Sequence, residues 1–379
     1  MVRDEIVALR AVPDGRRRNP PDQMQHSTAA SERALAATAH KLTADLAAAR
    51  PAIYWADLIL TALVAYAAFA GALLLPTGLE RAAAFVVSAL AFYRGVSFIH
   101  EVSHLRPQDV PGFKAGYNAL IGVPYLVPSL MYEGVHNQHH AKSRYGTALD
   151  PEYMPLARQT VWHVLGFIAI SALAPVGLLI RFGILTPLAA VIPPLRKFVV
   201  ERCSALAINP AFIRDHPTDA QRPLWILLET LCSLWAISFV GLTVAGVIPL
   251  RVFLTALALG SAVAVINQLR TLVAHHWENE GDEMSSTGQF LDSVNVPPPS
   301  TLPMLWAPVG LRYHGLHHLL PRLPYHALGA AHRRLCEALP PESPYHKGSH
   351  RGFWHVTGRL LGAIRDNRRA PRPEIVPGE

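Results

Sequence analysis

Histidines recur in this sequence at spacings that suit metal binding. They form one H-x-x-x-H box at 100–104 and two H-x-x-H-H boxes at 136–140 and 314–318. Residues three or four positions apart lie on one face of a helix, so each box aims its imidazoles in one direction. Imidazole is a ligand shared by iron, zinc and copper. The candidate ligands in these boxes are His100, His104, His136, His139, His140, His314, His317 and His318.

A fourth segment, His275-His276, ends a long apolar run and can add one more ligand. Eight or nine imidazoles exceed what a single metal ion holds. The four segments together therefore predict two metal ions lying side by side. Adjacent residues on a helix point about 100° apart, so we expect only one of this pair to bind.

Other uses of the histidines fit the sequence less well. The first box also reads H-E-x-x-H, the signature of a zinc protease with a glutamate as general base. Such a site needs one further ligand and would leave both H-x-x-H-H boxes unused. A haem protein needs only one or two axial histidines, so the excess of histidines here argues against a haem site. A metal store or carrier stays open, because ligand type alone does not establish reactivity. We expect Glu101 to accept the outer N–H of a bound imidazole.

The composition predicts that these segments are positioned by membrane helices. Hydrophobic residues make up 51% of the chain and charged residues 16%, and the mean hydropathy is +0.22. Uncharged runs at 58–75, 230–250 and 252–269 reach the length of about 18–20 residues that crosses a bilayer. A fourth run, 82–93, extends past Arg94 to the first histidine box.

These runs predict an all-α integral membrane protein with four transmembrane helices in two hairpins. Interfacial helices and a cytoplasmic cap that carries the histidine boxes complete the expected fold. Segments 115–132 and 159–195 are apolar too, but prolines interrupt both. The boxes can share a site only if they emerge on one side of the membrane. We therefore expect segment 115–132 to be interfacial or re-entrant. We expect segment 159–195 to lie in the interface, with a shallow pair of helices that crosses and returns as the alternative.

The expected domains are a cytoplasmic N-terminal arm with a surface helix at 1–50, a membrane domain at 51–340 and a basic tail at 341–379. Ser31 is placed to cap the surface helix, and residues 1–33 lack the apolar core of a signal peptide. Lys and Arg number eight in residues 1–50 and ten after His318. This asymmetry predicts that both termini and the metal site are cytoplasmic. Docking of an acidic electron carrier or an acyl carrier is a weaker explanation.

The order of the boxes and the residues that flank them resemble those of the membrane fatty acid desaturase family, which includes hydroxylases and related oxygenases. The likeness covers about residues 54–335. Y-G-T at 145–147 and D-P-E-Y at 150–153 follow the second box, and H-H-L-L-P at 317–321 closes the third. These stretches are similar to those of bacterial members.

The resemblance implies that nine histidines hold two irons and that the ninth ends the last span. Arg-Thr-x-x-x-His at 270–275 resembles the family's motif at this position. His275 is therefore preferred as the ninth ligand, with His276 as the fallback. Family members often carry an asparagine one turn earlier that holds a water on iron. Thr271 occupies that position here and Asn267 lies two turns back, so either can replace it. Carboxylates expected to tune the centre are those of Glu101, Asp150, Glu278, Asp282 and Asp292.

The activity implied by the resemblance is that of a membrane fatty acyl desaturase. It would use O₂ and external electrons to introduce a C=C bond into a lipid or carrier-bound acyl chain. The three cysteines form no C-x-x-C, so electrons are expected from a separate ferredoxin, rubredoxin or cytochrome. Membrane lipid is an expected partner and nucleic acid is not. The family alone favours desaturation over hydroxylation or another oxygenation, which stay as alternatives.

Overall fold

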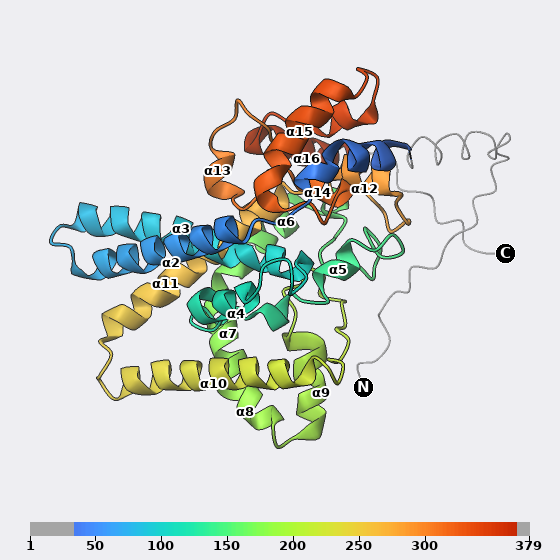
Figure 1. The fold of residues 1–379 in the computed structure, drawn as a ribbon. Coiled ribbons are helices and arrows are strands. Elements are labelled where there is room, and N and C mark those ends of the chain that lie inside the picture. The colour runs from blue at the N-terminus through green and yellow to red at the C-terminus, as the bar shows by residue number, and fades with distance from the viewer. Residues whose placement is uncertain (1–33, 370–379) are drawn as a thin grey trace.

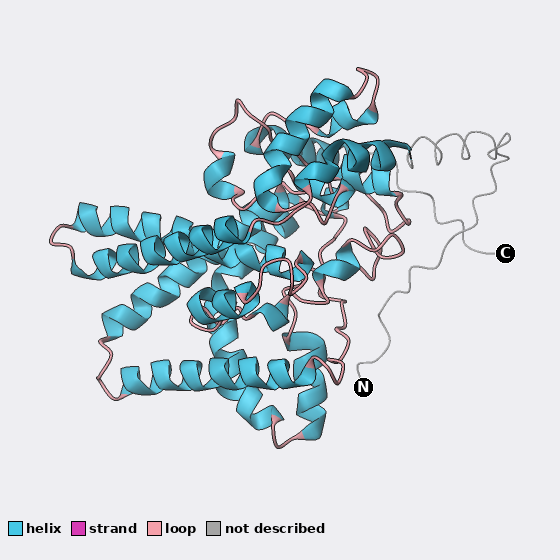
Figure 2. Ribbon diagram, viewed as in Figure 1, coloured by secondary structure: helices cyan, strands magenta, loops and turns pink. Residues whose placement is uncertain are grey.

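The structure, a computed structural model, describes residues 34–369. The predicted N-terminal arm at 1–30, the cap at Ser31 and residues 370–379 lie outside the described residues. Within the described range the elements are helices, joined by turns and three isolated bridges, and no strand forms (Figure 2). The all-α prediction is therefore confirmed.

The first predicted hairpin is formed by α2 (Pro51–Leu74) and α3 (Gly78–His104) (Figure 1). Thr77 caps α3 in a capping box: its hydroxyl accepts from the backbone N–H of Glu80 at 3.2 Å, and the Glu80 carboxylate accepts from the N–H of Thr77 at 3.2 Å. The hydroxyl of Ser88 donates to the carbonyl of Ala65 across the hairpin. Helix α3 thus runs without a break from the turn to the first histidine box.

The second predicted pair is α10 (Arg222–Val244) and α11 (Leu250–Leu272). Helix α11 packs against α3 and also against two helices from the middle of the chain, α6 (Val161–Ala169) and α7 (Ala174–Ile180). It therefore stands between the first hairpin and the middle of the chain, and its last turn leads directly to the histidine pair at 275–276.

A fifth helical stretch, Val161–Ala189, is long and apolar enough to cross a membrane, in addition to the four predicted spans. It joins α6 and α7 to α8 (Thr186–Ala189) through a 3₁₀ turn, η5 (Ile170–Leu173), and a π-helical turn, η6 (Arg181–Leu185). In Figure 1 this light-green stretch runs from the upper to the lower part of the view, crosswise to α2, α3 and α10.

A buried ion pair ties this stretch to α10. Arg181 is 3% exposed and donates to one carboxylate oxygen of Glu229 at 2.5 Å, while Arg196 donates to the other at 2.6 Å. A charge in an apolar environment needs a partner. The pair therefore fixes how Val161–Ala189 lies against α10.

The segment at 115–132 is interrupted, as its prolines predict. Its pieces are α4 (Phe113–Tyr117), a π turn η2 (Asn118–Gly122) and a 3₁₀ turn η3 (Ser129–Met131). The Asn118 amide holds the fold-back, because its oxygen accepts from the N–H of Ser129 at 2.8 Å and its nitrogen donates to the Ser129 hydroxyl at 3.0 Å.

A cap follows the membrane helices in the chain. Its main helices are α14 (His314–Leu319), α15 (Tyr325–Ala338) and α16 (Phe353–Arg369). The other elements, which include a helix at 34–43, are η1 (Ala44–Leu46), α5 (His136–His139), η4 (Leu156–Arg158), α9 (Pro193–Cys203), α12 (Ser286–Asp292), α13 (Pro303–Trp306) and η7 (Pro344–Gly348).

The C-terminal region is more ordered than the basic tail that the sequence predicts. In α16 the side chains of Val356, Leu360 and Ile364 are buried, and the helix lies against η4. Their i, i+4, i+8 spacing is the usual mark of an amphipathic helix. One arginine between them, Arg359, and three directly after them conceal that pattern when only charge is counted.

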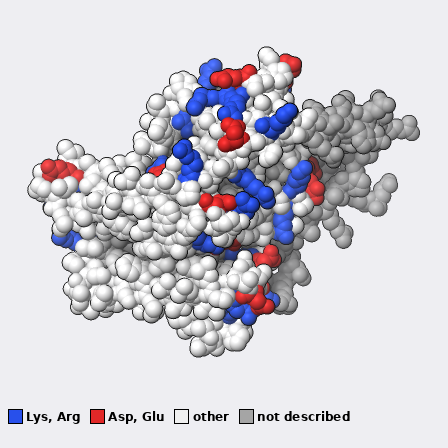
Figure 3. Space-filling view, in the orientation of Figure 1, with Lys and Arg blue, Asp and Glu red and all other residues white. Residues whose placement is uncertain are grey.

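The surface divides into an apolar and a charged part. Figure 3 shows that Lys, Arg, Asp and Glu gather over the cap side, whereas the surface over the long hairpin helices is nearly free of charge except at the far tips. Large apolar side chains are exposed there, among them Leu60, Leu63 and Leu234. An apolar surface of this extent suits contact with lipid.

Candidate metal centre

All nine predicted histidines come together in two groups of buried or half-buried side chains. Within each group one nitrogen atom of every histidine lies within 4.8 Å of the corresponding atoms of the others. The five-histidine group is His100, His104, His136, His140 and His317. The four-histidine group is His139, His275, His314 and His318.

The two H-x-x-H-H boxes divide their ligands between the groups. In the second box His136 and His140 enter the five-histidine group and His139 enters the other. In the third box His314 and His318 belong to the four-histidine group and His317 to the five-histidine group. At 100° per residue, the i+3 ring points about 60–100° away from the rings of the i, i+4 pair. The expectation that each box aims all its imidazoles in one direction is therefore wrong. The boxes thus interleave.

The two groups lie next to each other. The rings of His140 and His318, from different groups, have centroids 4.4 Å apart, and those of His136 and His139 are 5.8 Å apart. The groups are close because each of the two H-x-x-H-H boxes, one at α5 and one in α14, contributes rings to both of them.

Nitrogen positions within the groups fit metal ligation. Nε2 of His140 lies 3.0 Å from Nε2 of both His136 and His317. Nε2 of His314 lies 3.1 Å from that of His275 and 3.2 Å from that of His318. Ligands about 2.1 Å from one ion at right angles stand about 3 Å apart. The nitrogens therefore stand at the spacing of neighbours around one ion.

Several inward nitrogens lack any other partner. Nε2 of His100, of His104 and of His139 is buried without a hydrogen bond in the described chain. A buried polar atom left unpaired is costly, and a metal ion would satisfy it. The residues therefore fit a metal, and a histidine-only donor set suits iron, zinc or copper alike.

Carboxylates hold the outer nitrogens of the second box. Nδ1 of His136 lies 2.8 Å from Glu152, and Nδ1 of His139 lies 2.9 Å from both oxygens of Asp150. Asp150 also accepts from the N–H of Gly146 at 2.8 Å. A carboxylate on Nδ1 keeps the proton there and turns the free lone pair of Nε2 inward. Asp150 was among the carboxylates expected to tune the centre. Glu152 was not, although it lies in the D-P-E-Y stretch at 150–153 and its spacing from the box could have suggested it.

Around His275 the contacts come from distant parts of the chain. Its Nδ1 lies 2.9 Å from the Tyr145 hydroxyl and 3.2 Å from that of Ser293, and Tyr145 donates to Asp292 at 2.7 Å. His276, in contrast, belongs to neither group, and its ring stacks edge-on to that of His350. Asp292 was among the predicted carboxylates, whereas Tyr145 stands in the Y-G-T stretch after the second box and had no predicted role at His275.

Other predicted partners lie elsewhere. The Glu101 carboxylate is 3.6 Å from Nδ1 of His100, longer than a hydrogen bond. It accepts instead from the Tyr54 hydroxyl at 2.6 Å and from the Tyr325 N–H at 3.3 Å. It thus ties α3 to α2 and α15 rather than facing a metal-bound water, as a protease base would. Glu278 is exposed and pairs with Arg359.

Burial favours the neutral form of several imidazoles in the groups. It lowers the pKa of His275 to about 4. It is also the main cause that lowers the pKa of His136, His140, His317 and His318 well below the ordinary value. His139 differs, because the carboxylate of Asp150 outweighs burial and raises its pKa. Only the neutral ring has a lone pair to offer, so the five rings with a lowered pKa are in the form that binds a cation at neutral pH.

A large cavity reaches the histidine groups. Its volume is about 710 Å³, and its lining extends from His100 and Glu152 to Val252 in the first turn of α11. Side chains of α3, α6, α7, α10 and α11 enclose it. The size is within the range of small-molecule cavities, about 300–1,000 Å³. Asn267 and Thr271, the two candidates for a water-holding residue, both line it.

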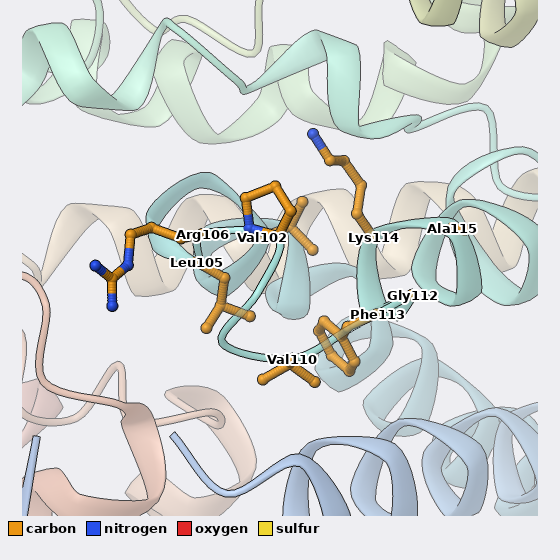
Figure 4. Close-up of a pocket in the computed structure, with 9 residues that line it drawn as sticks. Val102, Leu105, Arg106, Val110, Gly112, Phe113, Lys114 and Ala115 are labelled. Atoms are coloured by element: carbon orange, nitrogen blue, oxygen red, sulfur yellow. The ribbon is translucent and has the colours of Figure 1, made fainter. Parts of the chain in front are cut away.

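A second pocket is far smaller. It has a volume of about 80 Å³ and lies in the loop after α3, between Val102 and Ala115 (Figure 4). Leu105, Val110 and Phe113 face it, while the charged end of Arg106 points away. Its lining contains no histidine, whereas His100 lines the large cavity.

Comparison with known proteins defines the class of this chain. The profile of the fatty acid desaturase family matches residues 79–349, so the chain belongs to that family. It is an oxidoreductase of a membrane family that uses a metal centre and O₂ on lipid substrates.

A more specific likeness is to a protein of Caulobacter vibrioides (strain NA1000 / CB15N) named ceramide hydroxylase. The two are 49% identical over 343 residues, which cover 90% of this chain and 97% of the relative. The aligned length is large enough that most of the histidine segments and cavity helices fall within it.

Proposed function

We propose that this protein hydroxylates a lipid of the ceramide class. The observation that carries the proposal is the 49% identity to a ceramide hydroxylase over 90% of the chain. The resemblance to the family alone favoured desaturation. Desaturation is therefore the second candidate, and the family match supports it. Both reactions begin by removing hydrogen from an unactivated C–H group.

The proposed cofactor is a pair of iron ions, one in each histidine group. Nine imidazoles in adjacent sets of five and four support two ions, and the family supports iron. When bound, the irons supply O₂ activation. Asp150 and Glu152 hold two of the rings in the orientation that binds, and we propose that Asp292 and Tyr145 do so for His275.

The cavity beside the groups supports a substrate with a long hydrocarbon chain. Its walls are made mainly of apolar residues such as Phe92, Phe167, Leu178 and Val263. Such a wall excludes water and holds methylene groups in fixed positions near His100. The chain's own part in the reaction is therefore to bind, orient and desolvate the lipid.

Electrons are proposed to come from a separate carrier such as a ferredoxin, a rubredoxin or a cytochrome. The three cysteines, Cys203, Cys232 and Cys336, are free and far apart in the sequence. The excess of Lys and Arg in residues 1–50 and after His318 supports a metal centre and termini on the cytoplasmic side.

The test is expression in a host that provides a ferredoxin-type donor and long-chain ceramide, followed by mass spectrometry of the lipids. Hydroxylation adds one oxygen atom to the ceramide, whereas desaturation removes two hydrogen atoms. We expect the oxygenated product with the wild type and none with His317→Ala. His216→Ala is the matched control, because His216 lies outside both groups. A ceramide that only loses hydrogen would overturn hydroxylation in favour of desaturation.

A further inference from the structure

Helix α11 lines the large cavity along almost its whole length, and its side chains change in character along the way. From Val252 to Ala264 the lining side chains of α11 are apolar. At a rise of about 1.5 Å per residue this stretch covers about 18 Å. The last turns then present Asn267, Gln268 and Thr271 to the same cavity. The apolar part is remote from the histidine groups and the polar part adjoins them.

The polar side chains of this last part have no partner in the described chain. Asn267, Gln268 and Thr271 make no side-chain hydrogen bond to other residues within 34–369. Gln268 is 9% exposed, whereas Thr271 is half-buried and Asn267 is exposed. Because all three line the cavity, their polar atoms are free to be satisfied there by a ligand or by water. Farther along, near Gly260, the hydroxyl of Tyr125 is also buried and unpaired. It is a single group among apolar neighbours.

Arg270 places this polar set beside the metal centre. Its guanidinium nitrogen lies 3.2 Å from Nδ1 of His314, whose Nε2 faces the four-histidine group. Arg270 also lines the cavity. Only one imidazole ring therefore separates the guanidinium from the position proposed for a metal. Glu152, on the other side, holds His136 and lines the same end.

We propose that Asn267, Gln268, Arg270 and Thr271 form a binding site for a carbonyl or hydroxyl oxygen of the lipid, next to the reacting carbon. This inference rests on the proposed function and deepens it. The hydrocarbon chain lies along the apolar part of α11, and the polar group enters the set at its end. Arg270 donates only, while the two amides and the hydroxyl donate and accept.

The polar set also determines which part of the lipid is oxidised. A methylene group in the middle of a long chain needs apolar walls on both sides of the metal centre. Here the wall along α11 is polar at that end. The oxidised carbon is therefore within a few bonds of the lipid's polar group, as in the amide-bearing part of a ceramide.

Binding provides the first test and needs no turnover. Purified protein in detergent is titrated with a short-chain ceramide, with the free fatty acid and with the alkane of equal chain length. We expect the wild type to bind the ceramide more tightly than the alkane. Asn267→Leu and Gln268→Leu keep similar volume and remove the polar atoms. Each is expected to weaken ceramide binding about three- to tenfold and to leave alkane binding unchanged. A preference for the free acid over the ceramide would assign the site to a carboxylate and overturn the ceramide-type group.

The matched control is Thr255→Val. Thr255 lies on α11 and donates to the carbonyl of Arg251, but it does not line the cavity. We expect its binding curves to match those of the wild type. Equal ceramide binding by Thr255→Val, Asn267→Leu and Gln268→Leu would overturn the inference.

Product analysis provides the second test. Tandem mass spectrometry locates the oxygen in the product of each variant, and metal content is measured alongside. We expect the wild type to oxidise one carbon next to the polar group and Asn267→Leu to spread oxidation along the chain with an unchanged metal content. A wild type that hydroxylates in mid-chain overturns the inference while the proposed function stands. A wild type that binds ceramide but forms no oxygenated product overturns the proposed function while the binding site stands.

Discussion

Glu152 and Asp150 show how single residues set up the histidine groups. Each accepts from the outer nitrogen of a ring whose other nitrogen points inward. Such partners fix the tautomer and the ring angle and make the ring a stronger ligand. Asp150 was among the carboxylates expected to tune the centre, but its pairing with His139 was not predicted. The contact of the Tyr145 hydroxyl with His275 was not predicted either, because the two residues are 130 positions apart in the sequence.

A first prediction concerns Glu152. Replacing it with Gln removes the charge that holds the His136 proton, so we expect iron affinity to fall about 10–100-fold, measured by competition with a chelator. Glu278→Gln is the matched control, because Glu278 is exposed and pairs only with Arg359. Equal affinity for the two variants would show that Glu152 does not support the centre.

A second prediction separates His275 from His276. Nε2 of His275 faces that of His314 at 3.1 Å, whereas His276 lies in neither group. We therefore expect His275→Ala to lose iron from the four-histidine group and His276→Ala to keep the full content, as measured by elemental analysis. The reverse pattern would move the ninth ligand to His276.

At the scale of elements, the hydropathy of the long helices made α2, α3, α10 and α11 predictable, because a bilayer demands an uninterrupted apolar helix. The stretch Val161–Ala189 was predicted to lie in the interface. It is a bent helix of spanning length, pinned to α10 by the pair of Arg181 and Glu229. Such a contact depends on tertiary packing and is invisible to hydropathy. Helix α16 was missed because its three buried residues stand in a stretch that was judged by its net positive charge.

A third prediction tests the buried ion pair. Glu229→Gln leaves Arg181 and Arg196 without a counter-charge, and breaking a buried pair costs about 3–5 kcal/mol. We expect a clearly lower thermal unfolding temperature in detergent. Arg222 forms an exposed ion pair with Asp219. Arg222→Gln is therefore the control, and it should change stability by less than about 1 kcal/mol.

The double variant Arg181→Met with Glu229→Leu completes this test. Replacing both charges by apolar side chains removes the desolvation penalty along with the attraction. It should therefore be more stable than Glu229→Gln alone. A single variant as stable as the wild type would show that the pair does not hold Val161–Ala189 in place.

For the whole molecule, one arrangement explains the others. Four segments from distant parts of the chain end at the same place: the end of α3, helix α5, the residues after α11, and α14. The hairpins and the bent middle stretch deliver them there, and the cavity between the same helices opens onto them. The sequence predicted this convergence, because histidine boxes that share a metal site must emerge on the same side of the membrane. It did not predict the polar end of the cavity, since that depends on which face of α11 turns inward.

The most direct measurement is the metal content of the purified full-length protein, by elemental analysis, with Mössbauer spectroscopy of iron-loaded samples. We predict two irons per chain that are magnetically coupled, a loss of that coupling in His317→Ala, and no change in His216→Ala. A single zinc per chain, or two irons without coupling, would contradict the paired histidine-ligated centre.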